Sequence, residues 1–94
     1  MLYGARMAEG GETLREMLLA GRKRAGMTQV DAMLAVGLRQ PISVSRYERG
    51  GAIPEPPTFA RMIATYGLDP DEAWAAWGVA YAERARAGLE ALED

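Results

Sequence analysis

Apolar residues recur along the chain at the spacing of amphipathic helices, and no stretch alternates for long enough to predict a β-strand. The helical spacing occurs in five segments, at residues 13–25, 28–36, 41–49, 56–66 and 69–92. Each segment starts at a residue suited to a helix N-terminus, namely Thr13, Thr28, Pro41, Pro56 and Asp69. A glycine follows each of the first four segments. The pattern predicts an all-α fold, a compact five-helix domain with an extended C-terminal helix.

The apolar faces of these segments predict one shared core. Leu14, Met17 and Leu18 repeat at helical spacing. Gly21 continues the same face, so we expect another helix to pass close to this glycine. In the last segment, Trp74 follows soon after the helix start and is expected to close the core.

The length of the chain predicts a single domain. Residues 1–12 show no clear pattern and are expected to form an N-terminal tail that is disordered. We expect the domain to span residues 13–94. Within it, residues 13–74 form the core and residues 75–94 a helical extension used for dimerisation.

The last helix carries its apolar spacing past the part of the chain that forms the core. A run of about twenty helical residues is about 30 Å long and should project beyond a small bundle. An exposed apolar stripe of that length is typical of a partner surface. We therefore expect a homodimer interface at Trp77, Tyr81, Ala85, Leu89 and Leu92. In the alternative, the helix folds back on the tail, where Leu2, Tyr3 and Met7 would cover it.

Charge is distributed unevenly, although the net charge is only −2. Residues 13–50 carry seven basic and three acidic side chains, whereas residues 51–94 carry three basic and eight acidic ones. A basic half beside an acidic half favours a surface that faces a polyanion. Simple solvation of helices explains the same charges, so both interpretations stay open at this point.

Several function classes lack their usual residues. The chain has no histidine and no cysteine, which are the commonest general base and the thiolate metal ligand. No glycine-rich phosphate loop is apparent. We therefore expect no enzymatic activity, no cofactor and no metal site. Neither a signal peptide nor a membrane span is recognisable, so we expect a cytoplasmic protein of a bacterium or of a phage-infected host.

The segment 41–49 has two chemically different faces on a helical wheel. Val44 and Tyr47 fall on one side with Glu48 beside them. The opposite side carries Ile42, Ser45, Arg46 and Arg49. An arginine can donate two hydrogen bonds to guanine, and an aliphatic group can touch a thymine methyl. The outer face is therefore suited to a DNA major groove, with a solvated basic face as the alternative.

Two short helices joined by a tight turn, the second with a basic outer face, are typical of a helix-turn-helix. Residues 14–74 resemble the Cro/repressor-type helix-turn-helix family, often called XRE or lambda-repressor-like. The resemblance rests on "LLAGRKRAGMTQ" (18–29), "VSRYERG" (44–50) and "AIPEPPTFARMIATYGLD" (52–69). This chain has one residue more than the family between Gly37 and Glu48, and we place it in "LRQP".

The resemblance implies roles for individual residues. Arg22 and Glu48 match an ion pair that joins the first helix to the end of the third, and Gln29 matches a phosphate contact. The expected base contacts are Gln40, Pro41, Ile42, Ser43, Ser45 and Arg46. The expected phosphate contacts are Thr28, Gln29, Arg39 and Arg49.

These features predict a DNA-binding transcriptional regulator of the phage-repressor, Cro or antitoxin type. The resemblance implies that it binds palindromic double-stranded DNA as a homodimer. The alternative is a protein-interaction module of the same fold, whose acidic C-terminal half holds a protein partner while DNA binding is weak or lost.

Overall fold

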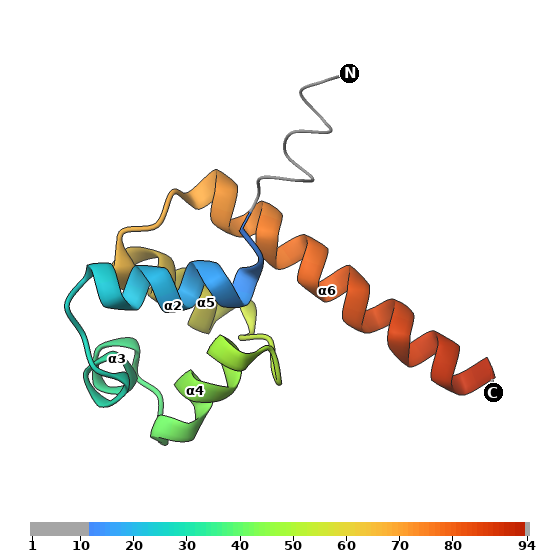
Figure 1. The fold of residues 1–94 in the computed structure, drawn as a ribbon, viewed down its shortest axis with the longest axis horizontal. Coiled ribbons are helices and arrows are strands. Elements are labelled where there is room, and N and C mark those ends of the chain that lie inside the picture. The colour runs from blue at the N-terminus through green and yellow to red at the C-terminus, as the bar shows by residue number, and fades with distance from the viewer. Residues whose placement is uncertain (1–11, 94) are drawn as a thin grey trace.

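The computed structural model describes residues 12–93, which form five helices and no strand (Figure 1). The helices are α2 (Leu14–Arg24), α3 (Gln29–Val36), α4 (Pro41–Arg49), α5 (Pro56–Tyr66) and α6 (Pro70–Glu93). The predicted all-α, five-helix fold with an extended last helix is confirmed. None of the described helices is long and apolar enough to cross a membrane.

The first two helices start where the sequence predicts because of reciprocal caps. The Thr13 hydroxyl accepts from Glu16 N at 3.3 Å, and the Glu16 carboxylate accepts from Thr13 N at 3.1 Å. Thr28 and Asp31 repeat this arrangement at 3.0 and 2.9 Å. These hydrogen bonds lower the pKa of both carboxyl groups, and so hold them ionised at the positive end of each helix.

Glycines in the left-handed conformation end both α3 and α4. Gly37 follows α3 with φ 87°, and Gly50 follows α4 with φ 81°. Other residues adopt these angles only with strain, so the two glycines fix both ends of the segment that contains α4.

The core lies among α2, α3, α4 and α5 and is closed by the start of α6. Its fully buried members include Leu18, Val36, Val44, Phe59 and Met62. α2 passes very close to the end of α5 at Gly21. A Cβ atom on this glycine would lie only 2.8 Å from Leu68 Cδ2. The expected close approach at Gly21 is therefore confirmed.

Gly21→Ala is expected to lower the free energy of unfolding by about 1–3 kcal/mol, because the added methyl group must displace a packed leucine. Gly78→Ala is the matched control, since this helical glycine of α6 has no atom within 4 Å of its Cβ position. That substitution should stabilise the protein by up to about 1 kcal/mol through helix propensity. Urea denaturation measures both; equal effects would contradict the close approach.

Ala73, rather than Trp74, closes the core. Ala73 is fully buried, whereas Trp74 is 38% exposed and packs the edge of its ring against Phe59, with centroids 4.9 Å apart. The expectation for Trp74 was wrong because adjacent helical residues point about 100° apart. The small Ala73 faces inward and lets α6 approach closely.

Contacts between α6 and the core continue well past its first turn. Trp77 is half-buried and donates its indole N–H to Pro54 O at 2.8 Å. Ala76 and Ala80 also pack against the core. The packed part of α6 therefore extends to Ala80.

The second half of α6 projects away from the other helices (Figure 1). Tyr81 is 56% exposed and stacks on Trp77, while Leu89 and Leu92 are 61% and 83% exposed. None of the described residues covers these leucines. The alternative in which Leu2, Tyr3 and Met7 cover this helix concerns residues outside the described part of the chain.

Candidate nucleic-acid interface

α3 and α4 are joined by a four-residue connection, residues 37–40. Leu38 is half-buried and donates its backbone N–H to Met33 O at 2.9 Å, which anchors the connection to α3. Gln40 takes the N-cap position of α4 in extended conformation, and Pro41 is the first helical residue. α4 is therefore an uninterrupted helix that begins at Pro41.

The two faces of α4 are separated as its sequence predicts. Val44 is fully buried and Glu48 is 7% exposed, so both anchor the helix. On the outer face, Ile42 is 54% exposed, and Arg46 and Arg49 are exposed. An exposed isoleucine between basic residues gives this face both an apolar contact and hydrogen-bond donors.

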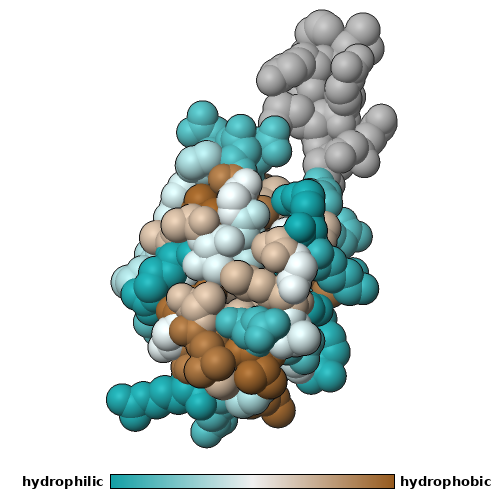
Figure 2. Space-filling view, turned by 90° about the vertical axis from the view of Figure 1, so that its left-hand side faces the viewer, coloured by the Kyte–Doolittle hydropathy of each residue, from teal (hydrophilic) through white to brown (hydrophobic). Residues whose placement is uncertain are grey.

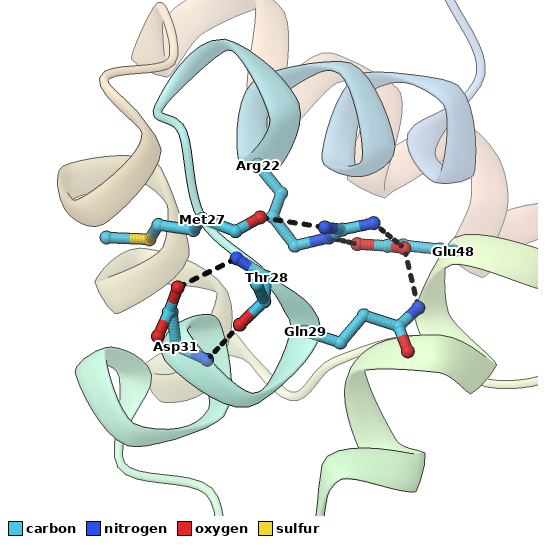
Figure 3. Close-up of polar contacts among 6 residues, drawn as sticks. All are labelled: Arg22, Met27, Thr28, Gln29, Asp31 and Glu48. Atoms are coloured by element: carbon cyan, nitrogen blue, oxygen red, sulfur yellow. Dashed lines mark hydrogen bonds and ion pairs between the residues drawn. The ribbon is translucent and has the colours of Figure 1, made fainter.

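A buried ion pair joins α2 to the last turn of α4 (Figure 3). Arg22 Nε lies 2.6 Å from Glu48 Oε2, and Arg22 Nη2 donates to Oε1 at 3.0 Å. The remaining Nη1 donates to Met27 O at 2.8 Å, in the loop that leads to α3. The hydrogen bonds to Glu48 raise the pKa of Arg22, so the guanidinium stays charged. One side chain thus ties three elements together.

Residues 11–76 match a protein family described as a helix-turn-helix domain. The match covers α2 to α5 and the start of α6, including the ion pair and both faces of α4. The chain belongs to this XRE-like helix-turn-helix family. Comparison with curated proteins and with solved structures finds no significant match.

Gln29, at the start of the helix-turn-helix, is part of the ion-pair network. Its side-chain Nε2 donates to Glu48 Oε1 at 3.1 Å, so this carboxylate receives hydrogen bonds from α2 and α3 together (Figure 3). The sequence pattern gave no sign of this contact. A glutamine tied to α4 in this way fixes the angle between the two helices of the motif.

The first turn of α3 has fewer backbone N–H groups free to bind a phosphate than its sequence suggests. The Thr28 N–H donates to Asp31, and the Asp31 N–H donates to the Thr28 hydroxyl. A phosphate at this end would therefore meet the Gln29 and Val30 N–H groups and the Thr28 hydroxyl proton. The negative charge of the Asp31 carboxylate beside them reduces the electrostatic attraction of this helix end for an anion.

Tyr66 adds a neutral neighbour to the network. Its side chain is 5% exposed, and among the described residues its hydroxyl has no hydrogen-bond partner. Burial, and then the negative charge of Glu48, raise the pKa of Tyr66 to about 12. The phenol therefore stays protonated beside the ion pair at physiological pH.

The other expected contact residues lie around the start and the outer face of α4. Arg39, Gln40 and Pro41 are exposed at its N-terminal end, and Ser43 and Ser45 are half-buried. Among the described residues, Arg22–Glu48 is the only ion pair. Arg39, Arg46 and Arg49 thus have no carboxylate of the described residues within 4 Å.

Two features of this region were not predicted. Arg61 of α5 donates from Nε to Val36 O at 2.7 Å and so caps the C-terminal end of α3. Apolar side chains also gather at the lower end of the face in Figure 2, on the side where Figure 1 places α3. α3 carries two exposed apolar residues, Val30 and Leu34, at 49% and 69% exposure.

Proposed function

We propose that this helix-turn-helix protein is a sequence-specific DNA-binding transcriptional regulator that reads the major groove with α4. The observation that carries the proposal is the outer face of α4, where Ile42, Arg46 and Arg49 are exposed. The opposite face is held by a buried ion pair, so the helix that carries these side chains is positioned before DNA arrives. Such pre-organisation reduces the entropy cost of binding.

The proposed contacts divide into two kinds. Arg46 donates to guanine O6 and N7, and Ile42 packs against a thymine methyl. The remaining base contacts, close to the N-terminus of α4, are Gln40, Pro41, Ser43 and Ser45. Phosphate contacts come from Thr28 and Gln29 at the start of α3, from Arg39 in the connection and from Arg49 at the end of α4.

A binding selection from random duplexes tests the proposal. The full-length protein should enrich one sequence class, and it should bind the selected duplex more tightly than a scrambled duplex of equal length. Fluorescence anisotropy at fixed salt gives both dissociation constants. Equal affinity for both duplexes would contradict sequence-specific reading.

The projecting half of α6 supports assembly as a homodimer on a palindromic site. Tyr81, Leu89 and Leu92 are exposed there, and Ala85 lies between them. The Cβ position of Gly88 has no atom within 4 Å, which leaves room for a second helix. Trp77 is already bound to Pro54 within one protomer, so its indole contributes only at the edge of the interface. A two-fold dimer would place two α4 helices in successive major grooves, about 34 Å apart.

Leu89→Glu/Leu92→Glu is expected to make the dimer monomeric at micromolar concentrations, because two charges would enter an apolar contact. Both side chains are exposed in the protomer, so its fold should persist. Val79→Glu is the matched control: this residue is 60% exposed and lies on the opposite side of α6 from Tyr81. Sedimentation velocity measures the assembly. A monomeric parent protein would contradict the dimer.

The apolar residues Val30 and Leu34 on α3 favour a second candidate function, binding of a protein partner by the exposed side of the helix-turn-helix. This function is compatible with DNA binding, since α4 carries the proposed reading face. If the selection described above enriches no sequence, the protein-interaction function becomes the better explanation.

A further inference from the structure

Two arginines from distant parts of the chain meet at the C-terminal end of α4. Arg84 of α6 has its Nη2 atom 3.5 Å from Gly50 O. Arg15 of α2 runs past the same residue, with its Cδ atom 3.1 Å from where a Cβ on Gly50 would stand. Both arginines are exposed and line one groove together with Gly50 and Tyr47. The fold therefore collects guanidinium groups around the residue that ends α4.

This groove is continuous with the outer face of α4. Arg84 also lines a second groove, between α6 and residues 51–56, and Arg46 lines that groove too. Arg46 is the central residue of the proposed DNA-reading face. An anion that follows this surface would pass from Arg46 to Arg84 without leaving the grooves.

The local charge favours an anion although acidic residues are present. Glu83 lines the first groove and Glu55 the second. Neither carboxylate lies within 4 Å of a basic group, since Arg22–Glu48 is the only ion pair among the described residues. Three arginines, at 15, 46 and 84, line these two grooves, against the two glutamates. The surface thus keeps an excess of guanidinium charge.

We propose that Arg15 and Arg84 form a phosphate-binding site for the DNA backbone at the C-terminal end of α4. This inference rests on the proposed function, because it assumes that α4 occupies a major groove. The first turn of α3 and Arg39 would hold the backbone near the start of α4, and the new site would hold it near the end. Gly50 has no side chain, which leaves room for the Arg15 side chain to pass it, and both guanidinium groups lie on exposed side chains that a DNA phosphate can reach. Contacts at both ends fix the tilt of α4 in the groove.

The salt dependence of DNA binding tests the site. The logarithm of the binding constant falls linearly with the logarithm of the salt concentration, and removal of one phosphate contact makes this slope less steep by about 0.9. Arg15→Gln and Arg84→Gln should each lower the slope by about this amount. Both substitutions should lower the affinity for the selected duplex and for the scrambled duplex by a similar factor. A merely structural role of either arginine would change affinity but would leave the slope unchanged.

Arg86→Gln is the matched control for Arg84→Gln. Arg86 is an exposed arginine of the same helix, and it is not among the described residues that line either groove. Arg24→Gln serves in the same way for Arg15, since Arg24 is exposed in the last turn of α2. The control variants should keep the slope of the parent protein. Thermal unfolding and sedimentation of all four variants should match the parent.

Three results would overturn the site. Slopes for Arg15→Gln and Arg84→Gln equal to those of their controls would mean that neither arginine meets a phosphate. Loss of the dimer at an unchanged slope would assign Arg84 to the contact between two copies of the chain. If the parent protein binds no duplex at any salt concentration, the result would contradict the proposed function and the phosphate-binding site together.

Discussion

Removal of the Glu48 carboxylate, in Glu48→Ala, is expected to lower the free energy of unfolding by about 3–5 kcal/mol. Arg22 is only 9% exposed, and it would keep a single hydrogen bond, to Met27 O. A guanidinium left in this position is not solvated by water and has no counter-charge. The same substitution also takes away the acceptor of the Gln29 side chain. Urea denaturation of the parent and the variant measures the difference.

A double-mutant cycle separates the ion pair from the packing of its parts. Arg22→Met and Glu48→Leu are each expected to be strongly destabilising, whereas the double variant should recover most of the lost stability, because no buried charge remains. Glu16→Gln is the matched control, since it alters an exposed carboxylate that only caps α2. It should cost much less than either single substitution of the ion pair, because only a cap on an exposed helix end is altered. Additive effects in the cycle would show that Arg22 and Glu48 do not interact in solution.

Arg46→Ala is expected to remove about 1–3 kcal/mol of preference for the selected duplex over a variant with one guanine replaced. Arg46 lies on the outer face of α4, which we propose enters the major groove, one turn before the end of the helix. Its loss should leave thermal stability unchanged, since the side chain is exposed. Anisotropy titrations with a set of single-base variants of the duplex would locate the base that it reads.

Arg49→Ala provides the comparison for Arg46→Ala. Arg49 is exposed in the last turn of the same helix, where we propose a phosphate contact. Its loss should lower the affinity for all duplexes by a similar factor and leave the order of preference among them unchanged. An Arg46→Ala protein that keeps the full preference of the parent would disprove the assignment of Arg46 as a base reader.

Helix starts were predictable because capping is local chemistry. Thr13 and Thr28 each reach a residue only three positions away, and Asp69 accepts from Glu72 N in the same manner. The inward residue of α6 was not predictable in this way. Ala73 and its neighbour Trp74 are both apolar, and only the packing of α6 against the rest of the core decides which of them is buried.

The site was predictable where the resemblance supplied a partner. The sequence suggested Arg22 and Glu48 together, and their side chains meet in the structure. The contact of Gln29 with Glu48 and that of Arg84 with Gly50 join residues 19 and 34 positions apart. Periodicity describes one helix at a time, so it cannot reveal contacts between helices. Those contacts require the tertiary arrangement.

The position of the tryptophans gives the protein an internal optical probe. Both tryptophans of the chain, Trp74 and Trp77, lie in the docked part of α6. One indole packs against Phe59, and the other donates to Pro54 O and stacks on Tyr81. Separation of α6 from the core would expose both rings to water while α2 to α5 stay helical. Fluorescence emission therefore reports the attachment of α6, and far-ultraviolet circular dichroism reports the helices, so the two signals distinguish local release from global unfolding in unlabelled protein.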